Sequence, residues 1–159
     1  MKVVYEFRNP NEYEFVDFIY VKEEKLEDFD PLSGSFSVIK CEGKFLMGFN
    51  SLRRQWELPA GKREAGETPK ECAIRELLEE TGQSVTALSL VGLVTSKHVE
   101  NGSLKRNPVY FSEVAQLQAF VENDETTRIM LWDMEEQIGR VDALDLKILE
   151  CLTGTTTHN

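Results

Sequence analysis

The chain has 159 residues and a net charge of −10, from 28 acidic and 18 basic residues. This acidic excess disfavours non-specific binding to a nucleic-acid backbone, and no apolar run or N-terminal leader indicates a membrane partner or export, so we expect a cytoplasmic protein. The three cysteines, Cys41, Cys72 and Cys151, lack Cys-x-x-Cys spacing and are predicted to be buried free thiols rather than disulfides or a zinc site.

The N-terminal part of the chain, residues 1–34, is predicted to belong to the same fold as the main domain at 35–152. Its residues Tyr13–Val21 are rich in aromatic and β-branched side chains and predict a strand. The charged segment Lys22–Ser35 ends in turn formers and is predicted to be a connection. The N-terminal strand could pair within one subunit or across a dimer, so both a monomer and a homodimer stay open. Residues 153–159 are predicted to be a polar tail.

From Ser35 onward, apolar runs separated by turn residues predict most of the sheet. Two runs flanking Glu42 and Gly43 predict a β-hairpin, and a short strand ends at Pro59. Further strands are expected at 86–96, 107–117 and 128–134, with a polar loop at 97–106, and helices at 69–81 and 142–152. Strands with two helices of this kind predict an α/β fold with a mixed sheet covered on both faces.

The helix at 69–81 has well-marked ends. Thr68 is a suitable N-cap, Pro69 suits the first helical position, and Glu71 follows Thr68 at capping-box spacing. Gly82 comes directly after the last turn, where a left-handed residue commonly ends a helix. The register of the helix is therefore fixed by the sequence.

Glu76, Glu79 and Glu80 lie within an arc of about 100° on this helix, close enough for their carboxylates to share a cation. They could equally form a solvated face, with Glu79 paired to Arg75 one turn earlier. The helix alone leaves both interpretations open. The opposite side is predicted to pack into the core and carries Ile74, Leu77, Leu78 and Thr81.

The loop before the helix makes the pattern much more restrictive. Gly61 is followed after five residues by Glu67, and after seven more by the run Arg75–Gly82. Over its 22 positions this stretch resembles the Nudix box of the Nudix hydrolase family, and it departs from it at Gln83, where an aliphatic residue is usual. The matching positions are Gly61, Glu67, Arg75, Glu76, Leu77, Glu79, Glu80 and Gly82.

The resemblance implies an α/β/α sandwich and a site for Mg²⁺ or Mn²⁺. It implies that Glu76, Glu79 and Glu80 bind the ion together with the Gly61 carbonyl. It also implies that Arg75 orients a glutamate and that Glu67 pairs with Arg75. Oxygen donors of this kind suit hard divalent cations, and the lack of thiol or imidazole argues against zinc.

The implied reaction is hydrolysis of a diphosphate linkage in a nucleoside di- or triphosphate derivative by metal-activated water. A general base could lie on the loop before Trp132, where Glu125 is favoured over Glu122. Lys97 is a further candidate for contact with an anionic ligand, and His98 is expected to have no catalytic role. The candidates for contact with the substrate are Arg53, Arg54, Trp56 and Arg106, with Phe36 and Tyr110 as further aromatic residues that could stack on a base.

Substrate identity stays open between several classes. The run Leu58–Gly61, "LPAG", occurs often in relatives that cleave ADP-sugars, whereas "LPGG" is more frequent in relatives that cleave oxidised nucleoside triphosphates such as 8-oxo-dGTP. A proline that ADP-ribose-cleaving relatives carry beyond the box is missing, because Lys97 and His98 stand there. A catalytically silent nucleotide-binding module and an acidic interaction protein are the remaining alternatives.

Overall fold

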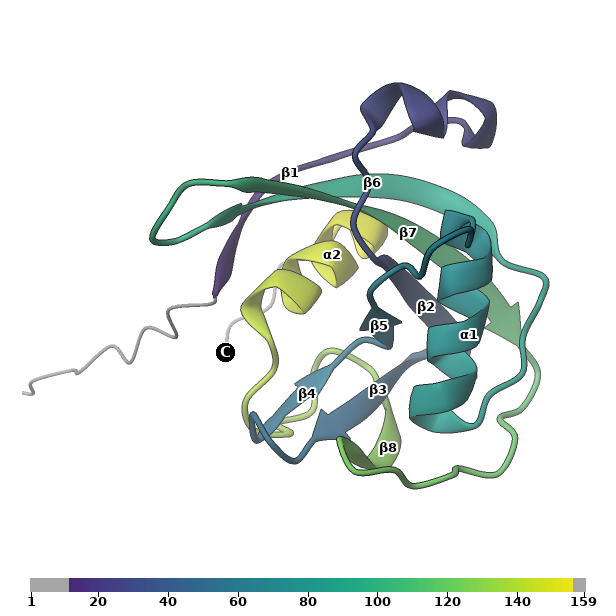
Figure 1. Ribbon diagram of the computed structural model, residues 1–159. Coiled ribbons are helices and arrows are strands. Elements are labelled where there is room, and N and C mark those ends of the chain that lie inside the picture. The colour runs from purple at the N-terminus through teal and green to yellow at the C-terminus, as the bar shows by residue number, and fades with distance from the viewer. Residues whose placement is uncertain (1–11, 156–159) are drawn as a thin grey trace, which may run out of the picture.

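The computed structural model describes residues 12–155, which form one mixed eight-stranded sheet with an α-helix packed on each face. Figure 1 shows the long β6–β7 ribbon passing over α2, with α1 beside β2. The elements in chain order are β1 (Tyr13–Ile19), the 3-10 helix η1 (Glu23–Phe29), β2 (Ser35–Cys41), β3 (Lys44–Asn50), β4 (Gln55–Glu57), β5 (Ala60–Gly61), α1 (Pro69–Thr81), β6 (Ser89–His98), β7 (Leu104–Val114), β8 (Thr126–Trp132) and α2 (Ala143–Thr153).

The strand order is β1-β6-β7-β2-β3-β4, with β8 paired to β3 and β5 paired to β2. Strands β2 and β7 run parallel, from Phe36 opposite Val109 onward, and the other strand pairs are antiparallel. The expected mixed sheet is therefore confirmed. Because β5 lies next to the start of β2, the sheet holds the loop that leads into α1.

The alternation of side chains along β2 divides the core into two layers. Val38 is fully buried in a cluster that contains Ile148 of α2. Its neighbour Ile39 is fully buried in a separate cluster that contains Leu77 of α1. The two helices thus cover opposite faces, and the predicted α/β/α sandwich is confirmed.

Helix α1 begins and ends as the sequence predicts. Thr68 Oγ1 accepts from the Glu71 amide at 3.1 Å, and Glu71 Oε1 accepts from the Thr68 amide at 2.9 Å, so the capping box is formed. Gly82 adopts the left-handed conformation, with φ 79°. The expectation that Leu78 packs into the core is wrong, since it is 48% exposed. Leu78 lies about 100° around the axis from the buried Leu77, past the edge of the core-facing side.

Three further expectations need correction. The connection at 22–35 contains η1, because Leu26 is buried against the sheet and anchors a helical turn. Most of the expected loop at 97–106 is strand, since β6 reaches His98 and β7 starts at Leu104, where pairing between the two strands outweighs their polar composition. Cys151 is an exposed free thiol, whereas Cys41 and Cys72 are buried as expected.

Within residues 12–155, neither helix has the length and apolar content needed to cross a membrane.

Candidate functional site

The loop after β4 brings Gly61 against the carboxylate of Glu76. A Cβ atom added to Gly61 would overlap the Glu76 carboxylate. The backbone conformation of Gly61 does not itself require glycine, because Gly61 is not among the residues of 12–155 that have a positive φ. The close approach of helix and loop is therefore the reason for glycine at this position. The Gly61 carbonyl accepts from Cys72 Sγ at 3.4 Å, which ties it to α1.

Arg75 links the loop to the acidic face of α1. Its Nε donates to Glu67 Oε2 at 2.7 Å and its Nη2 to Glu67 Oε1 at 3.0 Å, a bidentate pair. Its Nη1 donates to Glu76 Oε1 at 2.8 Å and to Glu79 Oε2 at 3.1 Å. The hydrogen bonds from Arg75 and the Glu64 amide lower the pKa of Glu67 to about 2. One guanidinium thus holds three carboxylates in place.

Glu80 is the most strongly perturbed acid of the cluster. Burial raises its pKa to about 9, the negative charge of Glu76 adds to the shift, and its Oε2 accepts from the Ala60 amide at 3.3 Å. Burial also raises the pKa of Glu76, and the hydrogen bond from Arg75 opposes that shift. One guanidinium cannot balance Glu67, Glu76 and Glu79, so the cluster keeps an excess of acidic groups.

The Gly61 carbonyl and the carboxylates of Glu76, Glu79 and Glu80 offer oxygen atoms, which suit a hard divalent cation, and the nearby Cys72 thiol donates to that carbonyl. Across residues 12–155, no three His, Cys, Asp or Glu side chains converge as a formed ion site, and Arg75 lies against Glu76 and Glu79 instead. A cation bound by Glu76 and Glu79 would compete with Arg75 for these two carboxylates. The chemistry of the donors fits the expected metal.

Glu57 on β4 also belongs to the cluster and was missed by the sequence reasoning. Its charge, like that of Glu125, contributes to the raised pKa of Glu80. Asn50 Nδ2 donates at 3.0 Å both to Glu57 Oε1 and to Glu125 Oε1. The available signal in the sequence was Asn50, a polar residue that ends an otherwise apolar run and that the structure buries.

The loop before β8 places Glu125 at the site. Asn123 Nδ2 donates to the backbone carbonyls of Glu79 at 3.1 Å and Glu80 at 2.9 Å, and Asn123 Oδ1 accepts from the Glu125 amide at 3.1 Å. One asparagine therefore joins the end of α1 to the loop that carries Glu125. The structure brings Glu125 close to Glu57, because Asn50 donates to both carboxylates.

Gln83, the departure from the box, is buried and joins the same loop to α1. Gln83 Nε2 donates to the Gln118 carbonyl at 2.9 Å, and the Gln118 amide donates to Gln83 Oε1 at 2.7 Å. In return, Gln118 Oε1 accepts from the Ser84 amide at 3.1 Å. The polar side chain at this packing position is satisfied by a reciprocal amide pair.

Two acidic residues at the start of α2, Asp142 and Asp145, hold the strand β4 that leads to the site. Gln55 Nε2 donates to Glu57 Oε2 at 2.7 Å and to Asp142 Oδ2 at 3.0 Å. Asp145 is 5% exposed, and its Oδ2 accepts from the Leu58 amide at 2.8 Å. Burial, followed by the charges of Asp142 and Glu57, raises the pKa of Asp145 well above its usual range. These contacts anchor β4, and with it the segment that leads to Gly61.

The residues expected to contact the substrate differ in their exposure to solvent. Trp56 is 6% exposed and its Nε1 donates to the Ile138 carbonyl at 2.9 Å, so it lies in the core rather than facing a ligand. Arg53 is exposed, but its Nη1 pairs with Glu57 Oε2 at 3.0 Å. Arg54 is exposed in the turn before β4, and Arg106 lies in β7. The aromatic residues Phe36 and Tyr110 are buried.

A family model described as the NUDIX domain matches residues 31–150. The chain belongs to the Nudix family. The resemblance seen in the box is thereby confirmed, and so, at the level of the family, is the expectation of a hydrolase. Nudix hydrolases generally use divalent metal ions, which agrees with the oxygen-rich cluster around Gly61.

Several relatives of this Nudix chain are informative. YtkD of Bacillus subtilis, provisionally named an 8-oxo-dGTP diphosphatase, is 29% identical over 133 residues, covering 80% of this chain and 82% of that protein. The solved pyrophosphohydrolase BsRppH of Bacillus subtilis is similar in fold, with a TM-score of 0.68, 21% identity and 94% of each chain covered. The NUDIX domain of Shewanella oneidensis NrtR, solved in complex with ADP ribose, matches with a TM-score of 0.64 at 16% identity, covering 84% of this chain and 97% of that one.

Proposed function

We propose that this Nudix hydrolase cleaves a diphosphate linkage in a nucleoside di- or triphosphate derivative, with Mg²⁺ or Mn²⁺ as its metal. The observation that carries the proposal is the approach of two carboxylates of α1 to β5: Glu76 lies against Gly61, and Glu80 accepts from the Ala60 amide. Glu76 and Glu80 have raised pKa values there because they are buried beside other acids. A cluster in which several carboxylates share one arginine is suited to bind a divalent cation.

The residues that would hold the ion are Glu76, Glu79, Glu80 and the Gly61 carbonyl. When bound, the ion would lower the pKa of a water molecule and neutralise phosphate oxygens. Arg75 acts as the orienting group, because its Nη1 contacts both Glu76 and Glu79. Glu67 fixes Arg75 through the bidentate pair, which braces the loop against α1.

Glu125 is our candidate for the general base that accepts the proton of the attacking water. It is exposed, yet Asn50 and Asn123 fix its side chain and its backbone next to Glu57 and Glu80. A carboxylate at the rim of the cluster can receive a proton and pass it to solvent. Arg54 and Arg106 remain proposed contacts for the phosphates or the leaving group.

A second candidate substrate class, oxidised purine nucleoside triphosphates, is favoured by the similarity to YtkD over most of both chains. The fold shared with the ADP-ribose complex of the NrtR domain keeps ADP-sugars as the other class. In either class the partner is a small nucleotide. We place the protein in the cytoplasm, in keeping with its free thiols at Cys41, Cys72 and Cys151.

The test is product release from a panel of nucleotide derivatives, with and without Mg²⁺. The panel should contain 8-oxo-dGTP, dGTP, ADP-ribose and a dinucleoside polyphosphate. We expect metal-dependent release in the wild type and its loss in Glu79→Gln and Glu80→Gln, with Glu100→Gln as the control on an exposed carboxylate in the turn between β6 and β7. Unchanged rates in both helix variants would end the proposal, and tight nucleotide binding without any product would favour a silent binding module.

A further inference from the structure

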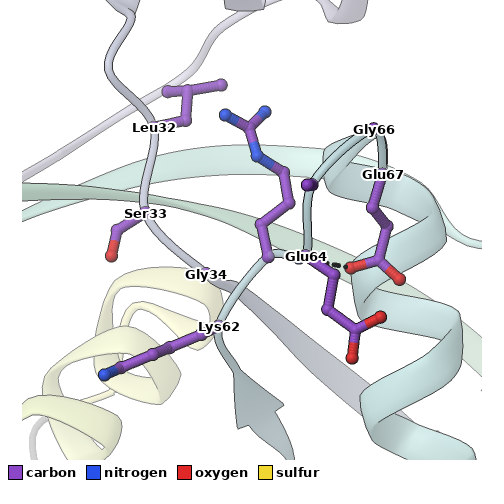
Figure 2. A pocket seen from close by; sticks show the side chains of 9 residues that line it. Leu32, Ser33, Gly34, Lys62, Glu64, Gly66 and Glu67 are labelled. Carbon is purple, nitrogen blue, oxygen red and sulfur yellow. Dashed lines mark hydrogen bonds between the residues drawn. The ribbon is translucent and has the colours of Figure 1, made fainter.

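The carboxylates of the site differ in the number of hydrogen-bond donors that hold them. Glu67 accepts from two nitrogens of Arg75 and, at 3.0 Å, from the Glu64 amide, the contact that Figure 2 shows as a dashed line. Glu125, the proposed general base, is exposed, and within residues 12–155 only Asn50 donates to its carboxylate, from Nδ2 to Oε1 at 3.0 Å. The direction of the Glu125 carboxylate therefore depends on one side chain.

Asn50 is a buried residue whose side chain uses its full hydrogen-bonding capacity. Its Nδ2 donates to Glu57 Oε1 and to Glu125 Oε1, each at 3.0 Å. Its Oδ1 accepts from the amides of Leu52 and Arg53, both at 3.0 Å. Because an asparagine amide carries two hydrogens and its carbonyl oxygen two lone pairs, no capacity is left over.

The two ends of the Asn50 side chain cannot be exchanged. If the amide were turned over, its oxygen would face two carboxylates and its nitrogen would face two backbone amides, so all four hydrogen bonds would be lost. The oxygen therefore holds the turn between β3 and β4, and the nitrogen holds the site. These two roles can be separated by mutation.

The contact from the Asn50 nitrogen matters more for Glu125 than for Glu57. Glu57 Oε2 also accepts from Gln55 Nε2 at 2.7 Å and from Arg53 Nη1 at 3.0 Å, so other donors hold it as well. The Glu125 backbone is fixed, since its amide and carbonyl are both hydrogen-bonded, but backbone bonds leave a side chain free to rotate about its χ angles.

We propose that Asn50 is the positioning residue for Glu125, and that it fixes the carboxylate in the direction from which it accepts the proton of the attacking water. The inference rests on the proposed function, because it takes Glu125 as the general base. A base acts only when it lies within hydrogen-bond reach of the proton that it removes. Without the contact from Asn50, Glu125 would divide its population between several rotamers, and only a part of it would be in reach.

The first experiment is a double-variant cycle in kcat, measured with saturating Mg²⁺ and the nucleotide of the panel that the wild type cleaves fastest. Asn50→Ser removes the donors to the site, while the serine hydroxyl can still accept from the amides of the turn. In the wild-type background kcat should fall about tenfold, with KM within about twofold. In the Glu125→Gln background, which has already lost the base, the same substitution should change kcat by less than about twofold.

An equal fall in kcat in both backgrounds would show that Asn50 only supports the fold, which overturns the proposal. The matched control is Asn101→Ser, because Asn101 Oδ1 accepts from the Ser103 amide at 2.8 Å in the turn between β6 and β7. This control should keep the kcat of the wild type. If Glu125→Gln itself keeps that kcat, Glu125 is not the base and the positioning role falls, while metal-dependent hydrolysis stands.

The second experiment measures melting temperatures at neutral pH and does not depend on turnover. Asn50→Asp keeps an oxygen for the turn amides but sets a negative acceptor against Glu125, so the melting temperature should fall. Adding Glu125→Gln restores a donor to this contact, and the double variant should melt about 2–4 °C above Asn50→Asp. If it does not, Asn50 does not hold Glu125 and the proposal is overturned. Absence of turnover in the wild type would refute the proposed function and with it the catalytic role of Asn50, and the melts would still decide whether the two side chains interact.

Discussion

Gly61→Ala should disable the site while leaving the fold almost intact. The added methyl group would overlap the Glu76 carboxylate, which would have to retreat by more than about 1 Å to reach ordinary contact distance. Because the obstructing atoms are at the end of a flexible side chain and the backbone φ of Gly61 is not positive, the cost to folding is small. A misplacement of about 1 Å in a catalytic group costs on the order of 100-fold in rate, or about 2.7 kcal/mol.

The assay is kcat/KM with saturating Mg²⁺, together with the melting temperature. The matched control is Gly66→Ala in the same loop, where a Cβ would meet no atom within 4 Å but φ is +77°. The control should lose about 1–2 kcal/mol of stability through backbone strain and keep its activity once folded. If Gly61→Ala retains activity within about threefold of the wild type, the close approach of Glu76 to Gly61 has no catalytic importance.

Three further predictions concern Arg75, Asp145 and Glu80. Arg75→Lys keeps the positive charge but removes the guanidinium that donates to both Glu67 and Glu79, so kcat/KM measured by steady-state kinetics should fall about tenfold or more. Asp145→Asn should preserve the hydrogen bond from the Leu58 amide. The pKa of Asp145 in the folded protein is raised above its usual 3.8, so ionisation of Asp145 destabilises the wild type as the pH rises. The melting temperature of the variant, relative to that of the wild type, should therefore increase from about pH 4 to about pH 8. Mn²⁺ at about 100 times its Kd should stabilise the wild type by roughly 2.7 kcal/mol, and Glu80→Gln should lose most of this shift in a thermal melt.

The sequence predicted those parts of the site whose contacts are local. Thr68 and Glu71 are three residues apart, so their capping box depends only on helix geometry. The acidic face of α1 follows from the same helical spacing. The resemblance to the Nudix box supplied the pairing of Glu67 with Arg75, which the structure shows at 2.7 Å.

The parts that the sequence did not predict depend on distant segments. Asn50 and Glu125 are 75 positions apart and meet only because β3 pairs with β8. Trp56 has the residue type of a stacking platform, but tertiary packing places it in the core. The role of Glu57 was hidden because a charged residue on a short strand usually faces solvent. Periodicity describes one element at a time and cannot show which elements will face each other.

The amide pair between Gln83 and Gln118 has a consequence for how activity can be tuned. It fastens the segment before Glu125 to the residues that directly follow α1. A substitution at Gln83 would remove both of these hydrogen bonds, whereas the Gln118 side chain makes neither of them. The placement of Glu125, the proposed proton acceptor, thus depends on a buried carboxamide at a position where the box usually has an aliphatic residue.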